Sequence, residues 1–202
     1  MNLLELTVRG GWLMLPIALC SLIVIALGVG RWLVIRRQLA ELGRFLAVWH
    51  QSGSVDRSRF LKECGQGPAA VALMAGEFGA GGGNRQESAQ KVETQARGSL
   101  FELEKGMGTM ATMAAVAPLL GFLGTVTGMV RAFMQIQNLG GNVNASVLAG
   151  GIWEALITTV AGLIVGIAAL LIHNYLAGML RQAARQLEQC GDLIVRHLGG
   201  AG

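Results

Sequence analysis

One carboxylate and several threonines stand in the most apolar part of the chain. Glu154 is followed by 26 residues, Ala155 to Leu180, that contain no Lys, Arg, Asp or Glu, and Thr158 and Thr159 lie within that stretch. Thr125 lies in a second uncharged stretch. An ionisable group in or beside a bilayer is costly and is retained mainly where it has a function. A carboxylate near hydroxyl groups could pass a proton or a cation onward, so these residues are the first candidates for chemistry.

The elements that must position these groups follow from the gaps between charges. No charged residue occurs in residues 10–30, 106–130 or 155–180, which are gaps of 21, 25 and 26 residues. A helix rises about 1.5 Å per residue and the hydrocarbon core is about 30 Å thick, so each gap can cross a membrane. With 52% hydrophobic and 14% charged residues, the chain is too apolar for an ordinary soluble domain. We therefore predict an all-α membrane protein with three transmembrane helices.

The predicted organisation has seven segments. They are an outer-surface amphipathic segment at 1–9, transmembrane helices at 10–30, 106–133 and 150–180, a cytoplasmic helical segment at 31–105, a periplasmic loop at 134–149, and a cytoplasmic C-terminal helix and tail at 181–202. Between Gln86 and Phe133 there is no strong stop signal, which predicts one long helix that begins in the cytoplasm and includes the second span. The third span should likewise continue through Leu187, and these extensions should pack together as a bundle.

The distribution of positive charge predicts the orientation. Residues 31–105 carry eleven Lys or Arg, Lys105 borders the second span, and Arg181 and Arg185 follow the third. By the positive-inside rule these three borders face the cytoplasm, which places the N-terminus outside and the C-terminus inside. The same arginines account for the net charge of +4. No recognised nucleic-acid motif accompanies that charge, so a nucleic-acid partner is not predicted.

The cysteines indicate neither a metal site nor a disulfide framework. Cys20, Cys64 and Cys190 fall in the first span, the cytoplasmic segment and the C-terminal helix, and their spacing suits neither arrangement. We interpret them as reduced packing residues.

Small residues form a stripe on each of the last two spans. Gly124 and Gly128 on one span, and Gly162 and Gly166 on the other, match the small-xxx-small pattern of closely packed membrane helices. The full stripes are Pro118, Gly121, Thr125, Gly128 and Ala132 on the second span, and Ile152, Ala155, Thr159, Gly162 and Gly166 on the third. One interpretation is tight helix packing. The other is a pore, in which these faces meet across a symmetric oligomer and line a central axis with hydroxyls.

Each polar residue also has a simpler interpretation. A threonine in a helix often bonds a carbonyl of its own helix, and Glu154 could reach water at the interface and help to start its helix. Glu154 and Thr158 are i,i+4 neighbours on one face, whereas Thr159 lies about 140° from Glu154 around the helix. If Thr159 faces a pore, Glu154 must point sideways toward a neighbouring helix or subunit. Glu154 would then act at an interface or gate rather than as a direct proton carrier.

Two stretches together carry a family resemblance. Residues 118–133, PLLGFLGTVTGMVRAF, and residues 151–163, GIWEALITTVAGL, resemble the paired signature of the ExbB/TolQ/MotA proton-channel family. The plan of three spans with a large first cytoplasmic segment extends the resemblance over nearly the whole chain. It is most similar to the ExbB/TolQ branch, since MotA proteins have four spans and a longer cytoplasmic part.

The resemblance implies a homopentamer in a bacterial inner membrane, surrounded by lipid, whose pore holds the single-span helices of an ExbD- or TolR-like dimer. Proton flow, rather than sodium flow, would drive a TonB- or TolA-like protein, with no cofactor. The family's polar pore residues fall on Thr125 and Thr159, and its intramembrane glutamate falls on Glu154.

Arg131 is not settled by the resemblance. It stands near the outer end of the second span, where a fixed charge is unexpected, and a salt bridge to Glu154 of its own or an adjacent subunit is a hypothesis based on their similar depth.

Three classes of function are weighed. The first is an energy-transducing channel subunit of an ExbB-like system, with a TolQ-like subunit of an envelope system as the alternative within that class. The second is a non-conducting oligomeric scaffold. The third, an enzyme, is disfavoured because the sequence shows no metal-ligand cluster, nucleophile elbow or phosphate loop.

Overall fold

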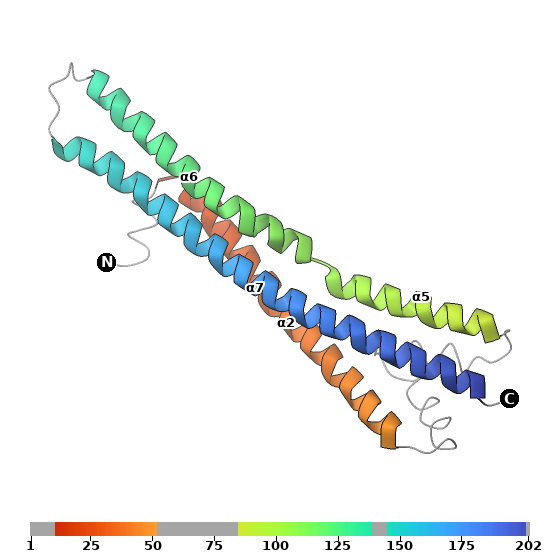
Figure 1. The fold of residues 1–202 in the computed structure, drawn as a ribbon. Coiled ribbons are helices and arrows are strands. Elements are labelled where there is room, and N and C mark those ends of the chain that lie inside the picture. The colour runs from red at the N-terminus through yellow and green to blue at the C-terminus, as the bar shows by residue number, and fades with distance from the viewer. Residues whose placement is uncertain (1–10, 52–84, 139–144, 201–202) are drawn as a thin grey trace. The chain divides into compact units, whose positions relative to one another are not determined.

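The computed structural model describes residues 11–51, 85–138 and 145–200, and within these ranges every regular element is a helix (Figure 1). The helices are α2 (Met14–Gln51), α5 (Arg85–Glu104), α6 (Met107–Asn138) and α7 (Ala145–Gly200). The all-α prediction is confirmed for this part of the chain. The predicted segment at 1–9, residue Cys64 and residues 139–144 of the predicted loop at 134–149 lie outside the described residues. The two ends of that predicted loop are helical instead, since α6 continues to Asn138 and α7 begins at Ala145.

Three helical stretches are long and apolar enough to cross a membrane. They are Met14–Gln51, Ala89–Asn138 and Ala149–Arg196. Each contains most or all of one of the uncharged gaps found in the sequence, and each extends beyond it. By length and composition, these stretches fit the predicted membrane protein.

A break between α5 and α6 corrects the expectation of one long helix from Gln86 onward. α5 ends at Glu104 and α6 begins at Met107. Gly106, between them, has a φ of +85°, a left-handed conformation that glycine adopts at little cost and that an α-helix cannot contain. A single glycine in a helical sequence pattern can lie within a helix or at its end, and here it lies just after the end of α5. The third span does continue as predicted, since α7 runs through Leu187.

The chain forms two compact units, and α2 and α7 each contribute to both. In the first unit, residues 1–29 and 106–174, the start of α2 buries one helical face. Ile17, Cys20 and Val24 are buried on it at intervals of three and four residues, and Leu13, just before the helix, is buried in line with them. Gly28 continues this face, and a methyl group added there would lie 3.1 Å from Cγ2 of Ile172 on α7.

The second unit, residues 30–105 and 175–202, is a bundle of three helical segments. α2 buries Ile35, Leu42, Phe45 and Trp49, and the rings of Phe45 and Trp49 stack with centroids 5.5 Å apart. Arg31 Nη1 donates to the carbonyl of Glu102 on α5 at 3.2 Å. On α7, the buried residues are Leu176, Ala183, Leu187, Cys190 and Ile194. These helical segments of α2, α5 and α7 thus belong to one compact unit.

Surface ion pairs support α5. Lys91 Nζ lies 3.2 Å from Glu87 Oε1, and Arg97 Nη2 lies 2.7 Å from Glu93 Oε1, both at i,i+4 spacing. These side chains are exposed, so each pair contributes only about 0.3–0.5 kcal/mol to the helix.

Two cysteines are free and buried, as predicted: Cys20 in the first unit and Cys190 in the second. Burial raises the pKa of the Cys190 thiol from 9.0 to about 12. Because the thiolate is the reactive species, a buried thiol of this kind is chemically inert at neutral pH.

We expect Cys190 to react with a maleimide about a thousandfold more slowly in the folded protein than after denaturation, since that is the difference in thiolate fraction. The measurement is mass spectrometry of labelled Cys20→Ser/Cys64→Ser protein at about pH 7.5, with and without detergent denaturation. Equal labelling rates in the two states would contradict the packing of this bundle.

Candidate functional site

α6 and the first half of α7 lie side by side (Figure 1). Small residues of both helices form the contact between them. A methyl group added at Gly162 would lie 2.5 Å from the carbonyl oxygen of Ala117 and 2.9 Å from Cα of Gly121. Further along the crossing, a methyl group at Gly128 would lie 2.8 Å from Cβ of Ala155. Glycine is therefore needed at this crossing because the two backbones nearly touch.

The same contact continues along both helices. Gly151 faces Ala132, Gly124 faces the side chain of Thr158, and Gly166 accommodates the ring of Pro118. The expectation that the two small-residue faces meet across an oligomer is thereby corrected, because they meet within one chain. Sequence periodicity shows which face of a helix is small but not which helix covers it.

The threonine hydroxyls have defined acceptors. Thr125 Oγ1 donates to the carbonyl of Phe122 at 2.7 Å, and Thr158 Oγ1 donates to that of Ala155 at 2.7 Å. Thr159 differs, because its hydroxyl donates across the crossing to the carbonyl of Gly121 on α6 at 2.9 Å. Thr159 thus ties the two helices together at their closest approach, while the other two follow the simpler pattern within their own helices.

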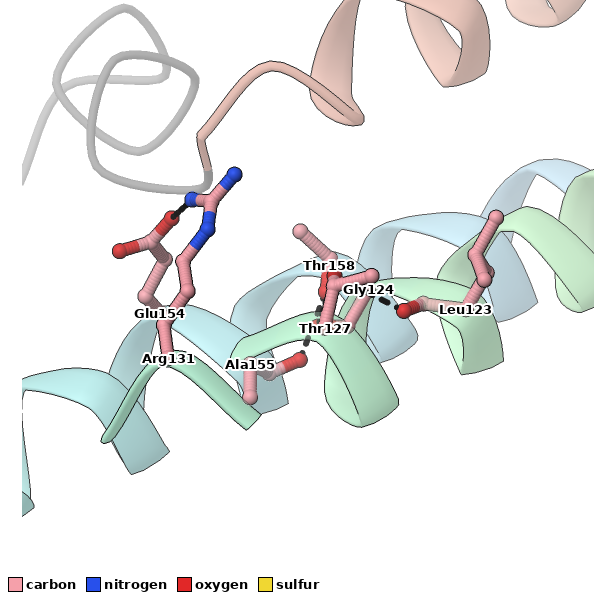
Figure 2. Close-up of polar contacts among 7 residues, drawn as sticks. All are labelled: Leu123, Gly124, Thr127, Arg131, Glu154, Ala155 and Thr158. Atoms are coloured by element: carbon pink, nitrogen blue, oxygen red, sulfur yellow. Dashed lines mark hydrogen bonds and ion pairs between the residues drawn. The ribbon is translucent and has the colours of Figure 1, made fainter. Parts of the chain in front are cut away.

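An ion pair lies beside the crossing. Arg131 Nη1 on α6 is 3.6 Å from Glu154 Oε1 on α7, within one chain (Figure 2). The arginine side chain is 55% exposed and the glutamate side chain 36% exposed, so both also face outward from the isolated chain. Glu154 therefore points toward α6 and Arg131, while Thr159 contacts α6 at a different level.

A small cavity adjoins the ion pair, with a volume of about 10 Å³. Its polar lining is Thr127, Arg131, Glu154 and Thr158; Gly124 and Gly128 of α6 and the turn Gly11–Leu13 before α2 complete it. A cavity of about 10–15 Å³ is the minimum that holds one water molecule. Because the Thr127 and Thr158 hydroxyls donate to carbonyls of their own helices, their oxygens remain able to accept a hydrogen bond.

The structure brings together some of the predicted residues and adds others. Glu154, Arg131 and Thr158 share the cavity, whereas Thr125 and Thr159 are not among its lining residues. Thr127 and Gly11 were not assigned a role in the sequence analysis. Thr127 lies one helical turn before Arg131, which places both on one face of α6. Gly11 approaches Glu154 only through tertiary packing, which no spacing in the sequence indicates.

The sequence comparisons decide the family. Residues 62–189 match the MotA/TolQ/ExbB proton channel family. This chain belongs to that family. The match includes α5, α6 and most of α7, and therefore the helix crossing, the ion pair's two residues and all four threonines discussed above.

Individual relatives carry ExbB names. The chain is 43% identical over 94 residues to a putative ExbB-like biopolymer transport protein of Synechocystis sp., a match that covers 45% of this chain and 37% of the relative. It is 38% identical over 109 residues to biopolymer transport protein ExbB of Neisseria gonorrhoeae, covering 52% and 49%. An ExbB homologue of Methanothermobacter thermautotrophicus is 33% identical over 129 residues, covering 63% and 45%. The chain spans less than half the length of these three relatives.

Proposed function

We propose that this member of the MotA/TolQ/ExbB family is a proton-conducting subunit of an energy-transducing complex in a bacterial inner membrane. The observation that carries the proposal is the ion pair of Glu154 and Arg131 at the crossing of two membrane-spanning helices. A carboxylate is retained in such a place when protonation or ion passage depends on it. Because the Thr159 hydroxyl bonds to α6, Thr159 does not turn Glu154 away from the path, and Glu154 is not confined to a gating role. In this proposal Glu154 takes up and releases the proton, and Thr125 and Thr159 supply hydroxyls to the path.

We propose the proton, rather than sodium, as the ion that passes this site. The pocket beside the ion pair has room for about one water molecule. A proton can pass through such a site because it moves between adjacent hydrogen-bonded groups.

The exposed apolar surface supports an oligomer with a partner. α6 exposes Leu119, Phe122 and Val126, and α7 exposes Leu163, Ile164 and Ile167, in the isolated chain. Apolar surface of this extent is covered by lipid or by other protein. We assign it to a homopentamer in lipid, with an ExbD- or TolR-like single-span dimer at its centre and a TonB- or TolA-like protein downstream. The N-terminus is outside and the C-terminus cytoplasmic in this arrangement.

A non-conducting scaffold is the competing function, and one set of observations favours it. Thr125, Thr127 and Thr158 all donate to carbonyls of their own helices, and the small residues are used in packing. A scaffold needs these contacts but does not need the hydroxyls as a proton path.

The double variant Thr125→Val/Thr159→Val separates the two functions. For a channel we expect proton flux to fall roughly tenfold or more, because a polar network that loses members loses its continuity. The measurement is proton uptake by liposomes that contain the co-purified complex under an imposed membrane potential. Loss of the Thr159–Gly121 bond should cost only about 1 kcal/mol of stability, so the complex should still assemble.

Thr112→Val is the matched control. Thr112 is exposed on α6 and donates to the carbonyl of Gly108 in its own helix at 3.0 Å, and it is remote in sequence from the site. We expect normal flux from this variant. Normal flux from the double variant as well would reject these threonines as the proton path, whereas the absence of proton flux from the unaltered complex would favour the scaffold.

A further inference from the structure

The turn before α2 lies directly against the Glu154 carboxylate (Figure 2). Gly11 has a φ of +68°, a conformation that residues with side chains rarely adopt. A methyl group added at Gly11 would overlap Oε1 of Glu154 and would lie 3.9 Å from Nη1 of Arg131. The backbone of Gly11 thus occupies one side of the ion pair, and a residue with a side chain would not fit there.

The turn is itself held in place. The amide of Met14 donates to the carbonyl of Gly11 at 3.2 Å, and the amide of Leu15 donates to that of Trp12 at 3.2 Å. Leu13 in the turn and Ile17 on α2 are 4% and 2% exposed and anchor the start of α2 in the first unit. The Glu154 side chain is partly exposed and could also point outward, away from Arg131. Contact with this turn therefore restricts where its carboxylate can point.

We propose that Gly11 is a positioning residue for Glu154, whose side-chain-free backbone holds the carboxylate against Arg131 and closes the small cavity on that side. The positioning follows from the geometry of the first unit. Its consequence for proton conduction rests on the proposed function, because a carboxylate turned away from the cavity could no longer exchange a proton with the groups that line it.

A double-mutant cycle tests the contact. Gly11→Ala should push the carboxylate out of its position, whereas in Gly11→Ala/Glu154→Asp the acidic side chain is one methylene shorter and leaves room for the new methyl group. The strain of a positive φ at alanine is present in both variants and cancels in the cycle. The readout is the rate at which a carbodiimide modifies the carboxylate at position 154, measured by peptide mass spectrometry relative to exposed Glu102 in the same chain.

We expect Gly11→Ala to raise the modification rate of Glu154 roughly tenfold, the factor that corresponds to a contact of ~1.4 kcal/mol. In the Glu154→Asp background, the same Gly11→Ala change should leave the rate at the shorter carboxylate nearly unchanged. Gly150→Ala is the matched control. A methyl group there meets nothing within 4 Å although Gly150 lies one turn before Glu154, so the rate should not change. Equal effects of Gly11→Ala in the wild-type and Glu154→Asp backgrounds would overturn the proposal.

If the Gly11→Ala protein does not fold, the amount of protein that accumulates in the membrane is measured in place of the labelling rate. The added Glu154→Asp change should then restore accumulation in the membrane, and Glu102→Asp should not; failure of Glu154→Asp to restore it overturns the positioning role. Proton flux separates this inference from the proposed function. A tenfold labelling effect with normal flux supports the positioning of Glu154 and contradicts its role in conduction.

Discussion

Replacement of Glu154 by alanine or glutamine is expected to abolish proton-driven energy coupling while the oligomer still assembles. In the proposed mechanism Glu154 carries the proton, and neither replacement can ionise. Groups that transfer protons contribute about 10²–10⁴-fold to rates, so proton flux should fall at least about a hundredfold. Stability should change less, because Glu154 and Arg131 are both partly exposed and such pairs contribute about 1 kcal/mol or less.

The measurement is proton uptake by liposomes that contain the co-purified complex, with size-exclusion chromatography to check assembly. Glu102→Gln is the control, since Glu102 is exposed on α5 and its carboxylate lies 3.8 Å from Lys105 in a surface pair. It should conduct normally. Wild-type flux in Glu154→Ala and in Thr159→Val would refute the proposed proton path through these residues, and wild-type energy coupling without any proton flux would refute the channel assignment.

Substitution of Gly162 by leucine is expected to prevent α6 and α7 from packing. The new Cβ would meet the carbonyl oxygen of Ala117 at 2.5 Å and the amide nitrogen of Gly121 at 3.1 Å. Backbone atoms cannot move aside as a flexible side chain can, so the helices must separate. Overpacking of this kind costs about 3 kcal/mol or more, and separation would also break the Thr159–Gly121 hydrogen bond.

Thermal unfolding of the detergent-solubilised protein measures the effect. Gly108→Leu makes the same chemical change on α6 at an exposed position where an added Cβ meets nothing within 4 Å. We expect Gly108→Leu to unfold near the wild-type temperature and Gly162→Leu to unfold far below it or to fail to accumulate. Equal unfolding temperatures would show that the crossing does not depend on the absence of a side chain at Gly162.

The helical membrane spans could be predicted because their signal is local. Charge is absent from stretches long enough to cross a bilayer, and the structure has a long apolar helix over each of them. The continuation of α7 beyond its span was predictable for the same reason, since nothing in the sequence stops it. The break at Gly106 was not predictable, because a glycine inside a helical pattern is compatible with both a helix and its end.

The sequence indicates which residues belong to the site better than it indicates which of them are in contact. Glu154 stands out as an acid at the head of an uncharged span, and its pairing with Arg131 could be raised as a hypothesis from similar depth alone. The partner of each glycine stripe could not be assigned, because packing within a chain and between chains uses the same small residues. The approach of Gly11 to Glu154 joins residues that are far apart in the sequence and is visible only in the folded chain.

The interruption at Gly106 also bears on how force travels through the molecule. α7 is one uninterrupted helix of 56 residues, and its hydrogen-bonded backbone transmits twist or axial load along its length. α5 and α6 are joined instead through a glycine whose backbone angles can change at low steric cost. A torque applied at one end of α7 therefore reaches the other end. The same torque applied to α5 is absorbed at Gly106, between α5 and α6. α7 is thus the stiff element, and residue 106 is the flexible one.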